Sequence, residues 1–112
     1  MDTLHSVSID AGSDDNGSPC FFIKLQGPHS ELNVTVSEPE LDRLRDVRDA
    51  HWLNRGSLRV GKCLGAPAFW SCEDHQLSVL VGPDDETWEV GYFAPEAVVR
   101  RLLDEIDSVR SK

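Results

Sequence analysis

Residues 20–40, CFFIKLQGPHSELNVTVSEPE, decide the first half of the fold. Apolar and polar residues alternate over residues 20–25 and again over residues 31–36, which is the two-residue period of half-buried β-strands. The five residues between them, QGPHS, are typical of a turn. We therefore predict an antiparallel hairpin.

A helix is predicted to begin directly after this hairpin. Ser37 and Glu40 have the spacing of a capping box, and Pro39 falls in the first turn, where its missing donor costs nothing. The apolar residues that follow recur at helical spacing: Leu41, Leu44, Val47 and Ala50. The predicted stop is Asn54-Arg55-Gly56.

Short alternating segments continue on both sides of this region. Further strands are predicted at residues 4–9, 57–63, 67–72, 76–81 and 87–93, and residues 10–19 are predicted to be a flexible loop. A second helix follows Pro95, with apolar residues at Val98, Leu102 and Ile106. The order β-β-β-α-β-β-β-β-α predicts one α+β domain over residues 1–112, with a mostly antiparallel sheet of six to seven strands and two helices.

Large apolar side chains are expected on both faces of this sheet. Adjacent strand residues point to opposite faces, and Phe21-Phe22 and Phe69-Trp70 are such neighbours. Either the helices divide between the two faces, or the sheet curls, or part of it meets a partner.

The chain of 112 residues carries 20 Asp and Glu against 11 Lys and Arg, a formal net charge of −9. The charge is −7 over residues 1–42, +4 over residues 43–62, −7 over residues 63–99 and +1 over the remainder. Such acidity disfavours direct binding to nucleic acid or to anionic membranes, because both depend on cationic side chains. We predict a basic protein as the partner, and the cations of residues 43–62 could equally pair with the chain's own acids.

The expected location is the cytoplasm. The first residues, MDTLH, lack the basic and apolar regions of a secretory signal, and apolar stretches are far shorter than the ~20 residues that span a bilayer. Cys20, Cys63 and Cys72 cannot all pair within the chain. An odd count is typical of reduced, buried thiols.

The best candidates for a metal site are Cys63, Cys72 and His75, which fall within thirteen residues. Structural zinc sites present two short ligand spacings, whereas this segment has one, between Cys72 and His75. The acidic run at residues 84–86 lacks the alternating oxygen ligands of a calcium loop. We therefore predict no metal and no cofactor.

No arrangement typical of nucleophilic catalysis occurs in the sequence. The chain contains no G-x-S-x-G, no H-E-x-x-H and no Gly-rich phosphate loop. The histidines lie on four different segments: His5, His29, His51 and His75. We predict that the protein is not an enzyme, and the catalytic alternative is Cys20 or Cys72 with a distant histidine.

Two acidic turns and two tryptophans make up the predicted partner-binding residues: Asp84, Asp85, Glu86, Glu73, Asp74, Trp52 and Trp70. The acids would steer a basic partner toward an aromatic anchor. In a meander the two turns lie at opposite ends of the strand between them, so they cannot form one compact patch. Trp88, Val90 and Tyr92 share one strand face and are expected in the core.

In size, acidity and its tryptophan-bearing strands, with the ending WEVGYFAPEAVV at residues 88–99, the chain resembles the small acidic immunity proteins of bacterial toxin systems. The resemblance implies a cytoplasmic inhibitor that occludes a toxin's active site, and it assigns no residue a role. The expected function is a non-catalytic protein-binding module, most concretely an immunity protein that binds a toxin domain. A small-molecule or metal-binding regulatory domain is the alternative, followed by a small enzyme, and a homodimer stays open.

Overall fold

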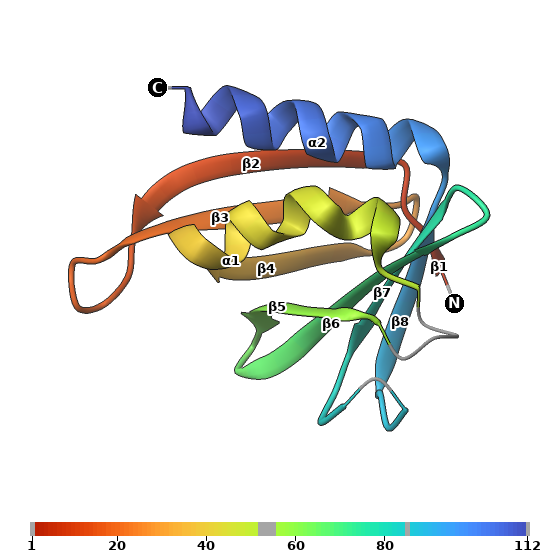
Figure 1. Ribbon diagram of the computed structural model, residues 1–112. Helices are drawn as coiled ribbons and strands as arrows, with labels where there is room; N and C mark the ends of the chain where they lie inside the picture. The colour runs from red at the N-terminus through yellow and green to blue at the C-terminus, as the bar shows by residue number, and fades with distance from the viewer. Residues whose placement is uncertain (1, 52–55, 85, 112) are drawn as a thin grey trace.

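The computed structural model describes residues 2–51, 56–84 and 86–111, which form one sheet and two α-helices (Figure 1). The strands are β1 (Asp2–Thr3), β2 (Ser6–Ser13), β3 (Pro19–Gln26), β4 (Glu31–Ser37), β5 (Leu58–Cys63), β6 (Ala66–Glu73), β7 (Gln76–Val81) and β8 (Val90–Ala94). Helix α1 (Glu38–Arg43) continues as the 3₁₀ helix η1 (Leu44–Asp49), and α2 (Glu96–Arg110) follows β8. The predicted α+β class and the predicted order of strands and helices are confirmed. In the described residues, no helix has the length and apolar character needed to cross a bilayer.

The predicted start of the first helix is confirmed. Glu40 donates its amide to the Ser37 hydroxyl at 3.3 Å, and the Glu40 carboxylate accepts the Ser37 amide at 2.9 Å. The regular α-helix ends at Arg43 and gives way to η1, which is shorter and tighter than the single helix expected. The predicted stop at residues 54–56 falls mostly outside the described residues.

The predicted loop at residues 10–19 is wrong in its bounds. Residues 10–13 belong to β2 and pair with residues 19–22 of β3, so the connection narrows to residues 14–18. Asp14 shapes this turn, because its Oδ1 accepts the amides of Asn16 and Ser18, each at 2.9 Å. Residues 10–13 bury almost no side chain, but their backbone groups still satisfy those of β3.

The sheet curls so that its two edge strands come together at one corner. Its strand order is β1-β8-β7-β6-β5-β4-β3-β2, antiparallel throughout except for β1, which is parallel to β8. Only Leu4 and His5 separate β1 from β2, although these strands lie at opposite ends of the order. The Leu4 amide donates to the Phe93 carbonyl at 2.7 Å, which continues the β1–β8 pairing, and the His5 amide donates to the Gln26 carbonyl at 2.8 Å, which continues the β2–β3 pairing. The chain itself joins the two edges at this corner.

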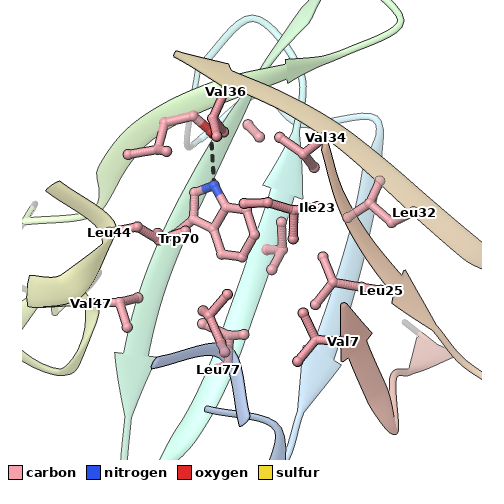
Figure 2. Packing of buried hydrophobic residues seen from close by; sticks show 14 of the residues in the cluster. Val7, Ile23, Leu25, Leu32, Val34, Val36, Leu44, Val47, Trp70 and Leu77 are labelled. Carbon is pink, nitrogen blue, oxygen red and sulfur yellow. Dashed lines mark hydrogen bonds between the residues drawn. The ribbon is translucent and has the colours of Figure 1, made fainter. Parts of the chain in front are cut away.

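The core fills the inside of this curl. Trp70 lies at its centre, between Ile23 and Val34 on one half of the sheet and Leu77 on the other (Figure 2). Both helices bury their apolar residues in the same core: Leu41, Leu44, Val47, Val98, Val99, Leu102 and Ile106. The sheet therefore curls and both helices pack on its inner face, while Phe22 on the outer face stays 43% exposed.

The two halves of the sheet meet at a distorted junction between β4 and β5. Their ladder, in strands that are both fully described, consists of the single pair Thr35 and Lys62, and the register of β5 against β6 shifts between Arg59 and Lys62. Two side chains bond the displaced backbone instead. Trp70 Nε1 donates to the Val60 carbonyl at 2.9 Å, and Glu40 Oε2 accepts the Gly61 amide at 2.7 Å.

Glycine is required at position 61 of this junction. Gly61 has a φ of +77°, and a Cβ there would lie 2.5 Å from Val36 Cγ1 and 2.7 Å from the Thr35 carbonyl oxygen. Gly65 has a similar φ of +85° but nothing within 4 Å of its Cβ position. The two glycines therefore share the backbone strain and differ only in the clash.

We expect Gly61→Ala to lower the free energy of unfolding by about 3–4 kcal/mol, because backbone strain and overpacking add. Gly65→Ala is the matched control and should cost about 1 kcal/mol, from the left-handed backbone alone. Urea unfolding of both variants measures the difference. Equal losses would show that the junction has room for a side chain.

The Glu40 carboxylate joins α1 to β5. Partial burial acts to raise the pKa of Glu40. Hydrogen bonds from the Ser37 and Gly61 amides and with the Ser37 hydroxyl, together with nearby Arg43, outweigh this effect, so the pKa of Glu40 lies below its ordinary value. A carboxyl whose pKa is lower in the folded chain stabilises the fold above its unfolded pKa. That stability is lost as the pH falls through the folded pKa.

We expect wild-type protein to lose more stability than Glu40→Gln as the pH falls from about 5 to about 3, across and below the ordinary carboxyl pKa. At neutral pH the variant should be less stable by about 1 kcal/mol, because a charge-assisted bond is replaced by a neutral one. Urea midpoints at a series of pH values test this. Parallel pH profiles would show that Glu40 does not hold the junction through its charge.

Candidate functional site

An apolar hollow of about 340 Å³ lies on the inner face of the sheet, at the end that the helices do not line. We call it the open-end hollow. It is lined by Glu31, Leu32, Cys63, Leu64, Ala66, Val81, Glu89, Val90 and Tyr92, which come from β4, the β5–β6 hairpin, the end of β7, and β8 with the residue before it. These segments are far apart in sequence and meet because the sheet curls.

Strand register explains why this end has an apolar floor. Val81 pairs with both Ala68 and Val90, so these three side chains share the inner face. At the other end of the same strands, Leu77 pairs with Ala94, and both are fully buried. Val90 is 42% exposed because helix α2 packs near the Leu77 end and does not extend to the open end.

The predicted core position is therefore wrong for Trp88 and Val90, which are exposed, and holds in part for Tyr92, which is half-buried and packs against the core. The regular strand begins only at Val90. Alternation identified the shared face of Val90 and Tyr92 in β8. It contained no information on how far along that face the helices extend.

Leu64 is the most exposed large apolar residue at this end. It sits at the tip of the β5–β6 hairpin with a φ of +51°, and its side chain is fully accessible. A leucine in the left-handed region is uncommon, and Asn or Gly would suit the turn better. Neither packing nor backbone geometry accounts for leucine at this position.

Two acids line the edge of the open-end hollow, Glu31 and Glu89. Glu31 alternates with the buried Leu32, and its carboxylate is turned to the outer face, where its two oxygens accept bonds from Gln26 Nε2 and Asn33 Nδ2, each at 3.0 Å. These bonds, first that from Asn33 and then that from Gln26, lower the pKa of Glu31, so it stays ionised at neutral pH. Glu89 supplies a second carboxylate, and no Lys or Arg is among the described residues that line the hollow.

The acidic turn after β7 flanks the same end. Asp84 shapes it, because its Oδ1 accepts the amides of Glu86 at 2.8 Å and Thr87 at 2.6 Å. This turn follows Val81 directly in the chain and leads back to Glu89, whose amide donates to the Val81 carbonyl at 2.9 Å. Asp84 and Glu86 therefore extend the acidic rim, and Asp85 lies outside the described residues.

Glu73 and Asp74 are at the other end of β7, as the meander predicted (Figure 1). They adjoin a polar pocket of about 290 Å³ lined by Arg48, His51, Cys72, Asp74 and His75. Its charges pair internally: Arg48 meets Glu96 at 2.6 Å, and His51 Nδ1 lies 3.7 Å from Glu73. The first pair fastens η1 to the start of α2, and the second links His51, two residues beyond η1, to the end of β6.

Neither the metal hypothesis nor a cysteine nucleophile finds support at this pocket. Cys63 pairs with Ala66 at the start of β6, about 20 Å along the strand from Cys72, so it cannot share a ligand with Cys72 and His75. Within the described residues no group of three His, Cys, Asp or Glu could hold a metal ion. Burial, followed by nearby Glu96, raises the pKa of the Cys72 thiol, so it stays protonated at neutral pH.

Trp70 was predicted to bind the partner, and this is wrong. Its side chain is fully buried, and its indole N–H bonds Val60. Trp52 lies outside the described residues. Within the basic segment, Arg45 pairs with Asp107 at 2.6 Å and Arg48 pairs with Glu96, so these cations are used inside the molecule.

Sequence reasoning missed most residues of the open-end hollow. Leu64 carried a usable signal, because a large apolar residue next to Gly65 in a turn has no core to enter. Glu31 and Glu89 are single acids among many, and their position on one rim follows from the curl of the sheet. Comparisons of the chain with protein-family models, with curated proteins and with solved structures gave no match.

Substitution of Trp70 should destabilise the fold, whereas substitution of Leu64 should leave its stability nearly unchanged. Trp70→Phe should lower the free energy of unfolding by about 2–4 kcal/mol, because it leaves a void and an unpaired Val60 carbonyl. Leu64→Asn should change it by less than about 0.5 kcal/mol, because the side chain is exposed and Asn tolerates the left-handed backbone. Chemical denaturation measures both, and a large loss in Leu64→Asn would mean that Leu64 serves the fold.

Proposed function

We propose that the chain is a non-catalytic protein-binding module that docks a basic protein on the open-end hollow. The observation that carries the proposal is an apolar hollow that no helix lines, with the exposed Leu64 and Val90 at its edge and the acidic turn of Asp84 and Glu86 next to it in the chain. An apolar centre inside a polar rim is the usual anatomy of a protein interface. Exposed apolar surface of this kind commonly marks a binding site.

Leu64 is the expected anchor of this interface. A side chain that is fully exposed in the free protein gains the most on burial, about 2 kcal/mol for leucine. Interfaces draw most of their affinity from a few such residues. A role in binding would also explain why a leucine occupies this left-handed turn position, where it is otherwise unfavourable.

The acids define the partner's charge. Asp84, Glu86 and Glu89 lie at the open end and would speed the approach of a cationic surface and discourage an anionic one. Glu73 and Asp74 lie at the β6–β7 turn, at the opposite end of β7 from the hollow, and take no part in this surface. Of the predicted acidic turns, only the one with Asp84 and Glu86 belongs to it. The docking surface is thus one acidic turn and the adjoining hollow.

The most concrete form of this function is immunity to a toxin. A toxin that acts on nucleic acid needs cations that contact phosphates, and an acidic module can occupy them. The resemblance to immunity proteins and the net charge of −9 support this form. The three free cysteines agree with a reducing, cytoplasmic setting.

The test is affinity capture from the source cells with the full chain as bait, read by quantitative mass spectrometry. We expect a basic protein that wild type and Phe22→Thr both retain and that Leu64→Asn loses by tenfold or more, as about 1.4–2 kcal/mol of lost burial implies. Phe22→Thr is the matched control, because it removes an exposed apolar residue from the outer face. Equal capture by Leu64→Asn and Phe22→Thr would contradict the proposed surface.

The purified partner then tests the role of charge. Glu86→Lys with Glu89→Lys should slow association about tenfold at low salt and flatten its salt dependence. Asp46→Lys with Asp104→Lys changes the net charge equally at exposed sites away from the hollow and should have little effect. Equal slowing by both pairs would attribute the effect to net charge rather than to the rim. Protection of cells that express the partner as a toxin would support the immunity form.

A further inference from the structure

Trp88 is a tryptophan that the buried core does not include. It is 39% exposed, whereas Trp70 is fully buried at the centre of the core. Among the described residues the indole N–H of Trp88 has no hydrogen-bond partner, whereas that of Trp70 bonds the Val60 carbonyl at 2.9 Å. A large ring with a free polar group is typical of interfaces, where tryptophan is enriched. Trp88 therefore has an apolar surface and a donor available for a partner.

The backbone on both sides of Trp88 is fixed. The Thr87 amide donates to Asp84 Oδ1 at 2.6 Å, and the Glu89 amide donates to the last carbonyl of β7 at 2.9 Å. The chain also crosses closely over Gly82, where a Cβ would lie 2.5 Å from Trp88 Cα. The indole is thus presented from a backbone that is already ordered, which lowers the entropic cost of binding.

Carboxylates flank Trp88 along the chain. Asp84, Glu86 and Glu89 lie within four residues of it, residues 86–90 are all exposed, and residues 82–89 contain no Lys or Arg. The face of an indole ring attracts cations, and nearby carboxylates attract them further and repel anions. This turn therefore fits a basic surface. A second copy of this chain is disfavoured, because each copy carries a net charge of −9.

We infer that Trp88 is the aromatic anchor of the interface with the basic partner, an inference that rests on the proposed function. The partner covers the indole with a cationic surface, and its surrounding cations meet the acids of the turn. Tryptophan is among the residues that most often dominate the binding energy of an interface. Trp88 thereby takes the role that the sequence suggested for Trp70, which is buried.

The first experiment follows Trp88 in the chain without substitution. The full chain is labelled with 5-fluorotryptophan, its ¹⁹F resonances are assigned with single Trp→Phe variants, and the probe is the basic protein isolated by affinity capture. In the free chain the Trp88 resonance should differ between H₂O and D₂O, because the ring is accessible to solvent, and that of Trp70 should not. Binding should remove most of the Trp88 difference and leave Trp70 unchanged. A Trp88 difference that is equal in the free and bound chain would overturn the anchor assignment.

The second experiment measures the affinity that the indole provides, by titration calorimetry with the same basic protein. Trp88→Ala should weaken binding about thirtyfold, the loss expected for a residue that dominates an interface. Trp88→Phe keeps an aromatic ring and should lose less. Phe22→Ala is the matched control, because Phe22 is 43% exposed on the outer face, and it should bind as wild type does. Equal affinities of Trp88→Ala and Phe22→Ala would contradict the inference, and the ¹⁹F measurement decides the matter if Trp88→Ala does not fold.

The outcomes separate this inference from the function on which it rests. If Leu64→Asn loses the basic protein while Trp88→Ala binds it as wild type does, the docking surface is right and the anchor assignment is wrong. If Trp88→Ala loses it while Leu64→Asn keeps it, the open-end hollow is not the docking surface and the anchor stands. If both variants bind as wild type does, or if no basic protein is captured, both proposals fail.

Discussion

The structure depends on the bonds that hold the Val60–Gly61 bulge between the two halves of the sheet. β4 and β5 share one ladder pair there, so the Trp70 indole and the Glu40 carboxylate satisfy backbone groups that a regular sheet would pair within itself. Each of these side chains is also fixed elsewhere, Trp70 by the core and Glu40 by the capping box. The bulge thereby connects helix, core and sheet at one point. Bulges bend strands and increase twist, and here the bend allows the sheet to curl and enclose its own core.

Curling decides where the molecule is covered and where it is not. The inner face of an eight-stranded sheet is wider than two helices of about 10 Å diameter can cover. α2 and η1 pack toward the Leu77 and Cys72 end of the strands, and their arginines pair with acids of the helix layer. The opposite end carries the exposed Leu64 and Val90, and among the described residues no Lys or Arg lines its hollow. The candidate site is thus a direct consequence of how the fold is closed.

Local signals predicted the elements well, because each depends on nearby residues. The hairpin over residues 20–36 followed from alternation and a turn, and the start of α1 followed from Ser37 and Glu40. Which part of the inner face the helices cover depends on contacts between residues far apart in sequence. The sequence-based prediction of buried residues failed at this point. Trp70 and Val90 both point to the inner face of the sheet. Trp70 is buried, whereas Val90 is exposed because no helix reaches it. Two acidic turns looked alike in the sequence, and only the topology shows that one adjoins an apolar floor while the other adjoins a paired polar pocket.

Amide hydrogen exchange of the full chain, free and bound to the captured basic protein, tests the central claim most directly, because it reports which backbone segments a partner covers. The account predicts new protection at residues 63–66 and 89–92, with no change at the β6–β7 turn or at residues 8–12 of β2. Protection centred on the β6–β7 turn and the polar pocket, with unchanged exchange at residues 63–66, would contradict it.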